Sequence, residues 1–175
     1  LDFLNFEVPA SWFQSINPLL IILLGFHVSA FWIFMRKKKI VSSSLFKISV
    51  GIIIMGLGFV FMYFASRESL SFGKSSMYWL FLAYLFHTVG ELCASPVILS
   101  YITKLSPKKL VASIMGIYFA TIGLGNKLAG TIGESSGNFG EATIFLGITI
   151  ICLVAGLTVI LSHKRLIKLS HGIDN

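Results

Sequence analysis

The sequence is poor in charged residues and in cysteine, and each scarcity excludes a class of protein. Only 12% of its 175 residues are charged, while 55% are hydrophobic and the mean hydropathy is +0.87. A soluble domain carries about 25% charged residues, so this balance excludes an ordinary soluble fold. The two cysteines, Cys93 and Cys152, lie in apolar stretches without metal-ligand spacing, which excludes a disulfide framework and a zinc site. The composition is that of an integral membrane protein.

Catalytic patterns are also missing from the sequence. It has no paired acid and base, no metal-ligating cluster and no nucleophile motif, which argues against an enzyme and predicts no cofactor or metal. The formal net charge of +7 could suggest nucleic acid as a partner. The basic residues lie in short loops between apolar spans, however, where they set membrane topology, so we expect no nucleic-acid partner.

Five apolar spans predict an all-α integral membrane fold, because each is long enough to cross a bilayer as a helix. Pro9 and Ser11 mark the start of the first span, and Ser106 followed by Pro107 resembles an N-cap and first helical residue for the fourth. Glycines in the second span allow close helix approach, and the small residues of the fourth are typical of a tightly packed or moving helix. The spans cover about residues 11–35, 48–65, 77–103, 107–132 and 143–162.

The distribution of basic residues predicts the orientation. Loops on one side of the membrane, together with the tail, carry eleven of them: Arg36, Lys37, Lys38, Lys39, Lys47, Lys104, Lys108, Lys109, Lys164, Arg165 and Lys168. The other side carries only two, Arg67 and Lys74. The positive-inside rule makes the first side cytoplasmic, so residue 1 lies outside and the carboxyl terminus inside. Because the chain does not begin with methionine and no signal places its external start, we expect at least one preceding span.

Glu91 is the central feature of the third span. The stretch 78–103 would form a helix of roughly 39 Å, longer than the ~30 Å hydrocarbon core, with Glu91 near its middle. A carboxylate at that depth costs at least ~2.5 to 3.5 kcal/mol and by default faces a polar cavity on a substrate or proton path. Ser95 and His87, four residues on either side, share its helix face. This stretch is therefore the predicted wall of a binding site.

Three sequence runs carry a family resemblance: residues 8–18 (VPASWFQSINP), residues 90–96 (GELCASP), and Gly125-Asn126 with Leu128-Ala129-Gly130. They resemble the proton-dependent oligopeptide transporter family of the major facilitator superfamily, and the likeness covers nearly the whole chain. In that family twelve helices form two six-helix bundles around a central cavity. The resemblance implies that residues 1–175 form a partial carboxyl-terminal bundle, helices eight to twelve, without the amino-terminal bundle and the seventh helix.

The resemblance also implies roles for individual residues. Glu91 would hold the terminal ammonium of a peptide, with Ser95 beside it, and Asn17 would hydrogen-bond the peptide backbone. Tyr118 stands where the family commonly has a tryptophan lining a side-chain pocket, so the ring is smaller and adds a hydroxyl. Lys127 replaces a residue that is usually apolar or aromatic, and the resemblance gives it no role.

Each of these residues also has a purely structural interpretation. Glu91 could pair between helices, although its depth favours function. Asn17 and Ser95, without their motifs, would be interhelical hydrogen-bonding groups worth about 0.6 kcal/mol. His27 and His87 are more often satisfied interior groups, which leaves His87 as a candidate for tuning the site. Tyr118 alone would be a packing residue, and Lys127 can snorkel to the outer interface.

We therefore expect proton-coupled symport of di- and tripeptides across the cell membrane, with H⁺ as the coupling ion and no other cofactor. The expected partners are di- and tripeptides, protons, the lipid bilayer, and the missing amino-terminal bundle and seventh helix of the same transporter. One alternative is a transporter of nitrate or another small solute, although an anion gives Glu91 no favourable partner. A second alternative is a non-transporting membrane scaffold subunit, which would tolerate loss of Glu91.

Overall fold

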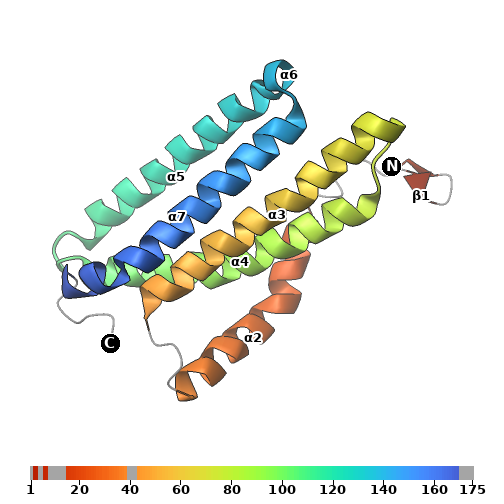
Figure 1. Ribbon diagram of the computed structural model, residues 1–175. Coiled ribbons are helices and arrows are strands. Elements are labelled where there is room, and N and C mark those ends of the chain that lie inside the picture. The colour runs from red at the N-terminus through yellow and green to blue at the C-terminus, as the bar shows by residue number, and fades with distance from the viewer. Residues whose placement is uncertain (1, 4–5, 8–14, 39–42, 170–175) are drawn as a thin grey trace.

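Five long helices make up most of the protein, as the all-α prediction requires. The computed structural model describes residues 2–3, 6–7, 15–38 and 43–169. The long helices are α2 (Ile16–Lys37), α3 (Ser44–Phe72), α4 (Met77–Leu105), α5 (Val111–Glu134) and α7 (Glu141–Leu169), and each is long and apolar enough to cross a membrane. The short helix α6 (Ser136–Phe139) joins α5 to α7, and two short antiparallel strands, β1 (Asp2–Phe3) and β2 (Phe6–Glu7), lie near the amino terminus (Figure 1).

Helix α3 is the centre of the bundle, with α4 packed on one side and α7 on the other (Figure 1). Glycines make this possible. A methyl group at Gly51 would lie 2.7 Å from the carbonyl oxygen of Gly90 on α4, and one at Gly56 would lie 2.8 Å from the Cβ of Cys152 on α7. Without side chains at these points, the helix backbones approach closely enough for extensive van der Waals contact.

The outer helices α2 and α5 are less enclosed. α2 packs against α4, and Leu20 is its buried residue. No residue of α5 is buried, and no atom lies within 4 Å of a methyl group built at Gly116, Gly123, Gly125 or Gly130. Tight packing was one of the two expectations for this glycine-rich helix, and the described residues do not provide it. The close contacts are on α3 instead.

Several helix ends differ from the predicted spans. α3 continues to Phe72, through most of the expected polar link 66–76, and ends at Gly73, whose φ of 70° is the left-handed conformation that closes many helices. The apolar stretch predicts only the length needed to cross a membrane, whereas the hydrogen-bonded helix continues into the polar residues beyond it. After the short link that follows Gly73, α4 begins at Met77 as expected.

Ser106 ends one helix instead of beginning the next. Its hydroxyl donates to the carbonyl of Ile102 at 2.7 Å, and residues 107–110 form a turn before α5 begins at Val111. The N-cap assigned to Ser106 was therefore wrong, because a serine before a proline also suits the last turn of the preceding helix. The expected start of the first span at Pro9 and Ser11 lies outside the described residues; α2 is described from Ile16.

Candidate functional site

Asn17 and Glu91 meet where the first turn of α2 crosses the middle of α4. The Asn17 Nδ2 donates to Glu91 Oε2 at 3.4 Å, across 74 residues of sequence. Both side chains are half-buried. The two residues come from the two specific motifs of the sequence, and the fold brings them into one polar group within an apolar bundle.

Thr88 completes this polar group and was not predicted from the sequence. Its hydroxyl donates to Asn17 Oδ1 at 2.6 Å, and Thr88 is fully buried, with 0% of its surface exposed. One signal could have found it: Thr88 lies three residues before Glu91 and therefore on a neighbouring part of the same helix face. Thr88, Asn17 and Glu91 are named the polar triad below.

The other predicted site residues are not joined to the polar triad by a described hydrogen bond. Ser95 lies one helical turn beyond Glu91 on α4 and is half-buried. Tyr118 lies on α5, and its described ring contact is with the adjacent Phe119, at 5.4 Å between centroids. The structure thus brings Asn17 into contact with Glu91, whereas Tyr118 on α5 has no described hydrogen bond or ring contact with either residue.

His87 faces α3 instead of the polar triad. Its ring lies 4.5 Å from the ring of Phe59, and a methyl group at Gly58 would be 2.7 Å from its Nε2. This nitrogen is buried without a hydrogen-bond partner among the described residues, beside a cavity of about 190 Å³ that Tyr84 and Phe145 also line. The absence of a side chain at Gly58 creates the space that turns the imidazole toward α3.

Two further polar side chains in the spans are exposed. His27 donates from Nδ1 to the carbonyl of Leu23 at 3.0 Å, which is a bond within its own helix. Lys127 is exposed on α5, and its carbonyl accepts the hydroxyl of Thr131 at 3.1 Å. Neither residue contacts the polar triad in the described part of the chain.

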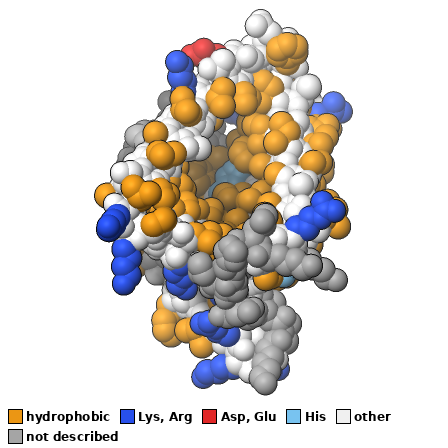
Figure 2. All heavy atoms as spheres, turned by 90° about the vertical axis from the view of Figure 1, so that its left-hand side faces the viewer, with side chains coloured by type: hydrophobic (Ala, Val, Ile, Leu, Met, Phe, Trp, Pro, Cys, Tyr) orange, Lys and Arg blue, Asp and Glu red, His pale blue; other side chains and the backbone are white. Residues whose placement is uncertain are grey.

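A larger hollow lies between α3, α5 and α7. It has a volume of about 520 Å³, and its walls are mainly apolar, with Leu128, Ala129 and Ile132 of α5 facing Ile144 and Ile148 of α7. Figure 2 shows one face of the molecule with a hollow at its centre and hydrophobic side chains around the rim. An exposed hollow with apolar walls is typical of a surface against which another hydrophobic element packs.

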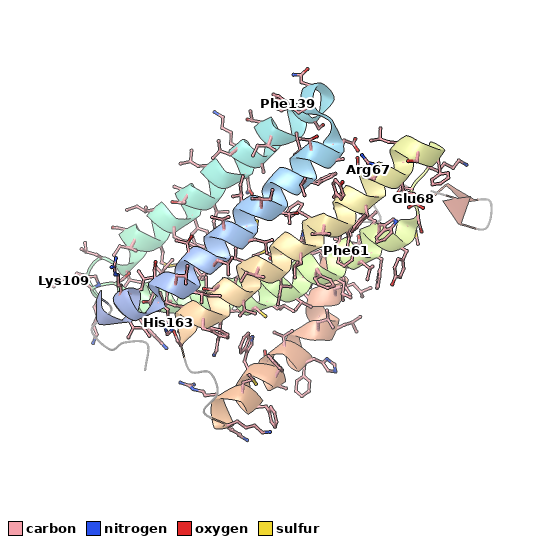
Figure 3. All side chains as sticks on the ribbon, in the orientation of Figure 1. Phe61, Arg67, Glu68, Lys109, Phe139 and His163 are labelled. Carbon is pink, nitrogen blue, oxygen red and sulfur yellow. The ribbon has the colours of Figure 1, made fainter. Side chains whose placement is uncertain are left out.

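Opposite ends of the bundle carry different charges. Lys109 and His163 lie at one end, and Arg67, Glu68 and Phe139 lie at the other (Figure 3). At the second end Glu68 Oε2 accepts the indole N–H of Trp79 at 2.6 Å and the backbone N–H of Ser76 at 3.2 Å. Glu68 thereby ties the end of α3 to the beginning of α4 across the short link between them.

The chemistry of the polar triad suits a cation more than an anion. Glu91 is an acidic group within the membrane-spanning part of α4, and its described hydrogen bond is the long one from Asn17. A half-buried carboxylate with so few donors gains most from a charged N–H donor, which an ammonium group provides. Within the described residues no group of three or more His, Cys, Asp or Glu side chains could hold a metal ion.

The chain is similar to several known proteins. The family model described as the POT family matches residues 1–142. A peptide transporter of Yersinia enterocolitica is 43% identical over 132 residues, which are 74% of this chain and 26% of that protein. A di-/tripeptide transporter of Lactococcus lactis is 27% identical over 94% of this chain and 33% of its own length.

Solved structures of similar proteins share the fold. A peptide transporter POT mutant in complex with sulfate gives a TM-score of 0.83 at 30% identity, over 94% of this chain and 33% of that one. A POT family transporter in complex with a thioalcohol-conjugated peptide gives a TM-score of 0.79 at 28% identity, over 94% of this chain and 34% of that one. The chain thus spans between a quarter and about a third of the relatives described here.

Proposed function

The chain belongs to the POT family, and from that premise we propose that it supplies part of the peptide site of a proton-coupled transporter for di- and tripeptides. The matched relatives are transporters, which confirms the prediction that the protein is not an enzyme. With its five apolar helices it is a multi-pass membrane protein. Its substrate, its coupling to protons and the parts that complete it are proposals.

The contact between Asn17 and Glu91 is the observation that carries this proposal. A free peptide begins with an ammonium group, followed one carbon later by a carbonyl oxygen. Glu91 offers a negative charge for the ammonium, and Asn17 offers amide hydrogen-bonding groups beside it. The two groups sit on different helices, so a bound peptide would be held across the α2–α4 junction.

We assign supporting roles to the other predicted residues. Ser95 lies beside Glu91 and would contribute a hydroxyl to the same end of the peptide. Tyr118 on α5 would line a side-chain pocket of the same site. His87, which packs on Gly58, would affect the site through the position of α4.

The hollow between α5 and α7 supports the proposal that the five long helices correspond to helices eight to twelve of the family, which are five of the six helices of one bundle. Such bundles consist of two three-helix repeats related by a pseudo-two-fold axis. In that scheme α3 corresponds to α7, and α2 corresponds to α5. The counterpart of α4 is the sixth helix of the bundle, the family's seventh helix, which is not among the described residues. α4 packs against α3 and α2, so its counterpart would pack against α7 and α5, where the 520 Å³ hollow lies.

We propose that the end with Lys109 and His163 is cytoplasmic, since the excess of basic residues belongs to that side. The amino-terminal end of α2 would then face outward, as the sequence predicts. A nitrate or other anion transporter is not favoured, because Glu91 would repel an anion. The alternative of a non-transporting scaffold is distinguished by removing the charge of Glu91. A transporter would lose activity, whereas a scaffold would tolerate the change.

The test is the variant Glu91→Gln in the complete transporter, with peptide affinity measured directly. Glutamine keeps the size and an acceptor oxygen but removes the charge. Removing one member of a poorly solvated charge pair costs about 2 to 5 kcal/mol, or roughly 30- to 5,000-fold in affinity. The matched control is Glu134→Gln, because Glu134 is an exposed glutamate at the end of α5.

We expect Glu91→Gln to lose affinity while its melting temperature and expression match the parent. Glu134→Gln should bind peptide as the parent does. A peptide with an acetylated amino terminus should bind the parent weakly and should discriminate little between the parent and Glu91→Gln. Unchanged affinity of Glu91→Gln for free-amino peptides would remove Glu91 from the site and would support the scaffold alternative.

A further inference from the structure

The hydroxyl of Thr88 makes an unusual hydrogen bond for a helical threonine. Five other threonines bond a carbonyl of their own helix: Thr103, Thr121, Thr131, Thr149 and Thr158. This local bond is the common choice in a membrane helix, because a hydroxyl in an apolar surrounding has no water to bond. Thr88 instead donates across to Asn17 on α2, at 2.6 Å.

Chemistry fixes the direction of the bonds in the polar triad. The amide of Asn17 has an oxygen that only accepts and a nitrogen that only donates, whereas ionised Glu91 only accepts. Turning the amide around would place its oxygen against the carboxylate of Glu91, two acceptors with no hydrogen between them. The nitrogen therefore faces Glu91, and the oxygen faces the hydroxyl of Thr88, which must donate its hydrogen.

From these contacts we propose that Thr88 is a positioning residue of the peptide site, which holds the Asn17 amide with its N–H groups on the side of Glu91. The proposal rests on the proposed peptide-binding function. The Asn17 oxygen accepts the Thr88 hydroxyl, so the N–H side of the amide is the side that lies beside Glu91. One of its two N–H groups points to Glu91, and the second is left to donate to a carbonyl oxygen.

This arrangement selects a particular end of the ligand. Glu91 binds an ammonium, and the neighbouring N–H of Asn17 binds the carbonyl that follows the ammonium in the first residue of a peptide. The site would therefore recognise an α-amino acyl group, in which the two features are adjacent. An amine without that carbonyl would engage Glu91 alone.

The main variant is Thr88→Val, which has nearly the same shape and removes the hydroxyl. It leaves the half-buried Asn17 oxygen without this donor, a loss of about 1 to 2 kcal/mol, so we expect peptide affinity to fall roughly 5- to 30-fold. Thr88→Ser restores a hydroxyl and should bring affinity back to within about twofold of the parent. Thr149→Val is the matched control, because Thr149 is also buried but donates to Phe145 of its own helix.

Two readouts separate positioning from stability. In an Asn17→Ala background, Thr88→Val should cause no further loss of peptide affinity, since the amide it orients is gone. The side-chain amide N–H signals of Asn17, observed by NMR without peptide, should shift in Thr88→Val and stay in place in Thr149→Val. Melting temperatures of all variants show whether a loss of affinity comes from unfolding.

The inference is overturned if Thr88→Val binds peptide as tightly as the parent, or if its loss persists fully in the Asn17→Ala background. Unchanged Asn17 amide signals in Thr88→Val also overturn it, because the orienting bond would then be absent. If the amide signals shift but the parent binds no peptide at all, the peptide-binding function fails while the Thr88–Asn17 bond stands. The two failures are thereby distinguishable.

Discussion

The contact between α3 and α4 at Gly51 leads to a sharp prediction about stability. A methyl group at Gly51 would lie 2.7 Å from the carbonyl oxygen of Gly90, 2.8 Å from the Cβ of Ala94 and 3.0 Å from its backbone nitrogen. Two of these three atoms belong to the helical backbone of α4, so no side-chain rotation can relieve the clash. Gly51→Ala must therefore push α3 and α4 apart.

The size of the effect follows from these distances. Carbon–oxygen contacts normally begin near ~3.3 Å, so the new methyl group would be roughly 0.6 Å too close to the Gly90 oxygen. Overpacking of this kind costs about 1 to 3 kcal/mol. Alanine also stabilises a helix interior by about 0.5 to 1 kcal/mol relative to glycine, which offsets part of that cost.

The control is Gly147→Ala in α7, where no atom lies within 4 Å of the added methyl group. It receives the same gain in helix propensity without the clash, so the difference between the two variants isolates the α3–α4 contact. We expect Gly51→Ala to be less stable than Gly147→Ala by about 1 to 3 kcal/mol, or roughly 5- to 160-fold in the ratio of folded to unfolded protein.

Reversible unfolding of the purified protein in bicelles, followed by tryptophan fluorescence, measures this difference. Glu91 is on α4 and its hydrogen bond from Asn17 is already 3.4 Å long, so displacement of α4 in Gly51→Ala should also weaken peptide binding. Equal stability of Gly51→Ala and Gly147→Ala would refute the reasoning, because it would show that α3 and α4 can separate without cost.

Two further predictions concern the ends of the bundle. Glu68→Ala removes the acceptor of two hydrogen bonds, from Trp79 and Ser76. It should destabilise the α3–α4 hairpin by about 1 to 2 kcal/mol in the same unfolding assay and change the tryptophan fluorescence. Stability equal to that of the control Glu134→Ala would contradict this prediction. Single cysteines at Lys109 and Asn138 should label from opposite sides with an impermeant thiol reagent, and external labelling at Lys109 would reverse the proposed orientation.

The five helices were predictable because a bilayer imposes a minimum length and hydrophobicity on anything that crosses it. The helix ends were less predictable. α3 extends to Phe72, well past its apolar span, because hydrogen bonding can continue where hydrophobicity stops and Gly73 then ends the helix. Ser106 was misassigned for a related reason, since one hydroxyl can serve either the end of α4 or the beginning of α5.

The candidate site was predicted residue by residue, but its internal contacts were not. Asn17 and Glu91 came from separate motifs, and only the crossing of α2 over α4 shows that they touch. Thr88 was missed because a threonine in an apolar helix usually bonds its own backbone, and the sequence does not reveal a partner 71 residues away. His87 shares the helix face of Glu91 by spacing, yet the space above Gly58 turns its ring toward α3.

Glycine content alone could not distinguish α3 from α5, although the register of the glycines explains the difference. Gly51 and Gly58 are seven residues apart and share one face of α3, toward α4, whereas Gly56 points toward α7. Each glycine of α3 thus has a partner helix that fills its groove. On α5 the face with Gly125, which borders the 520 Å³ hollow, has no such partner among the described residues. The helix that we propose as the counterpart of α4 must therefore bring side chains large enough to fill that hollow, and its own small residues should fall where it meets α7.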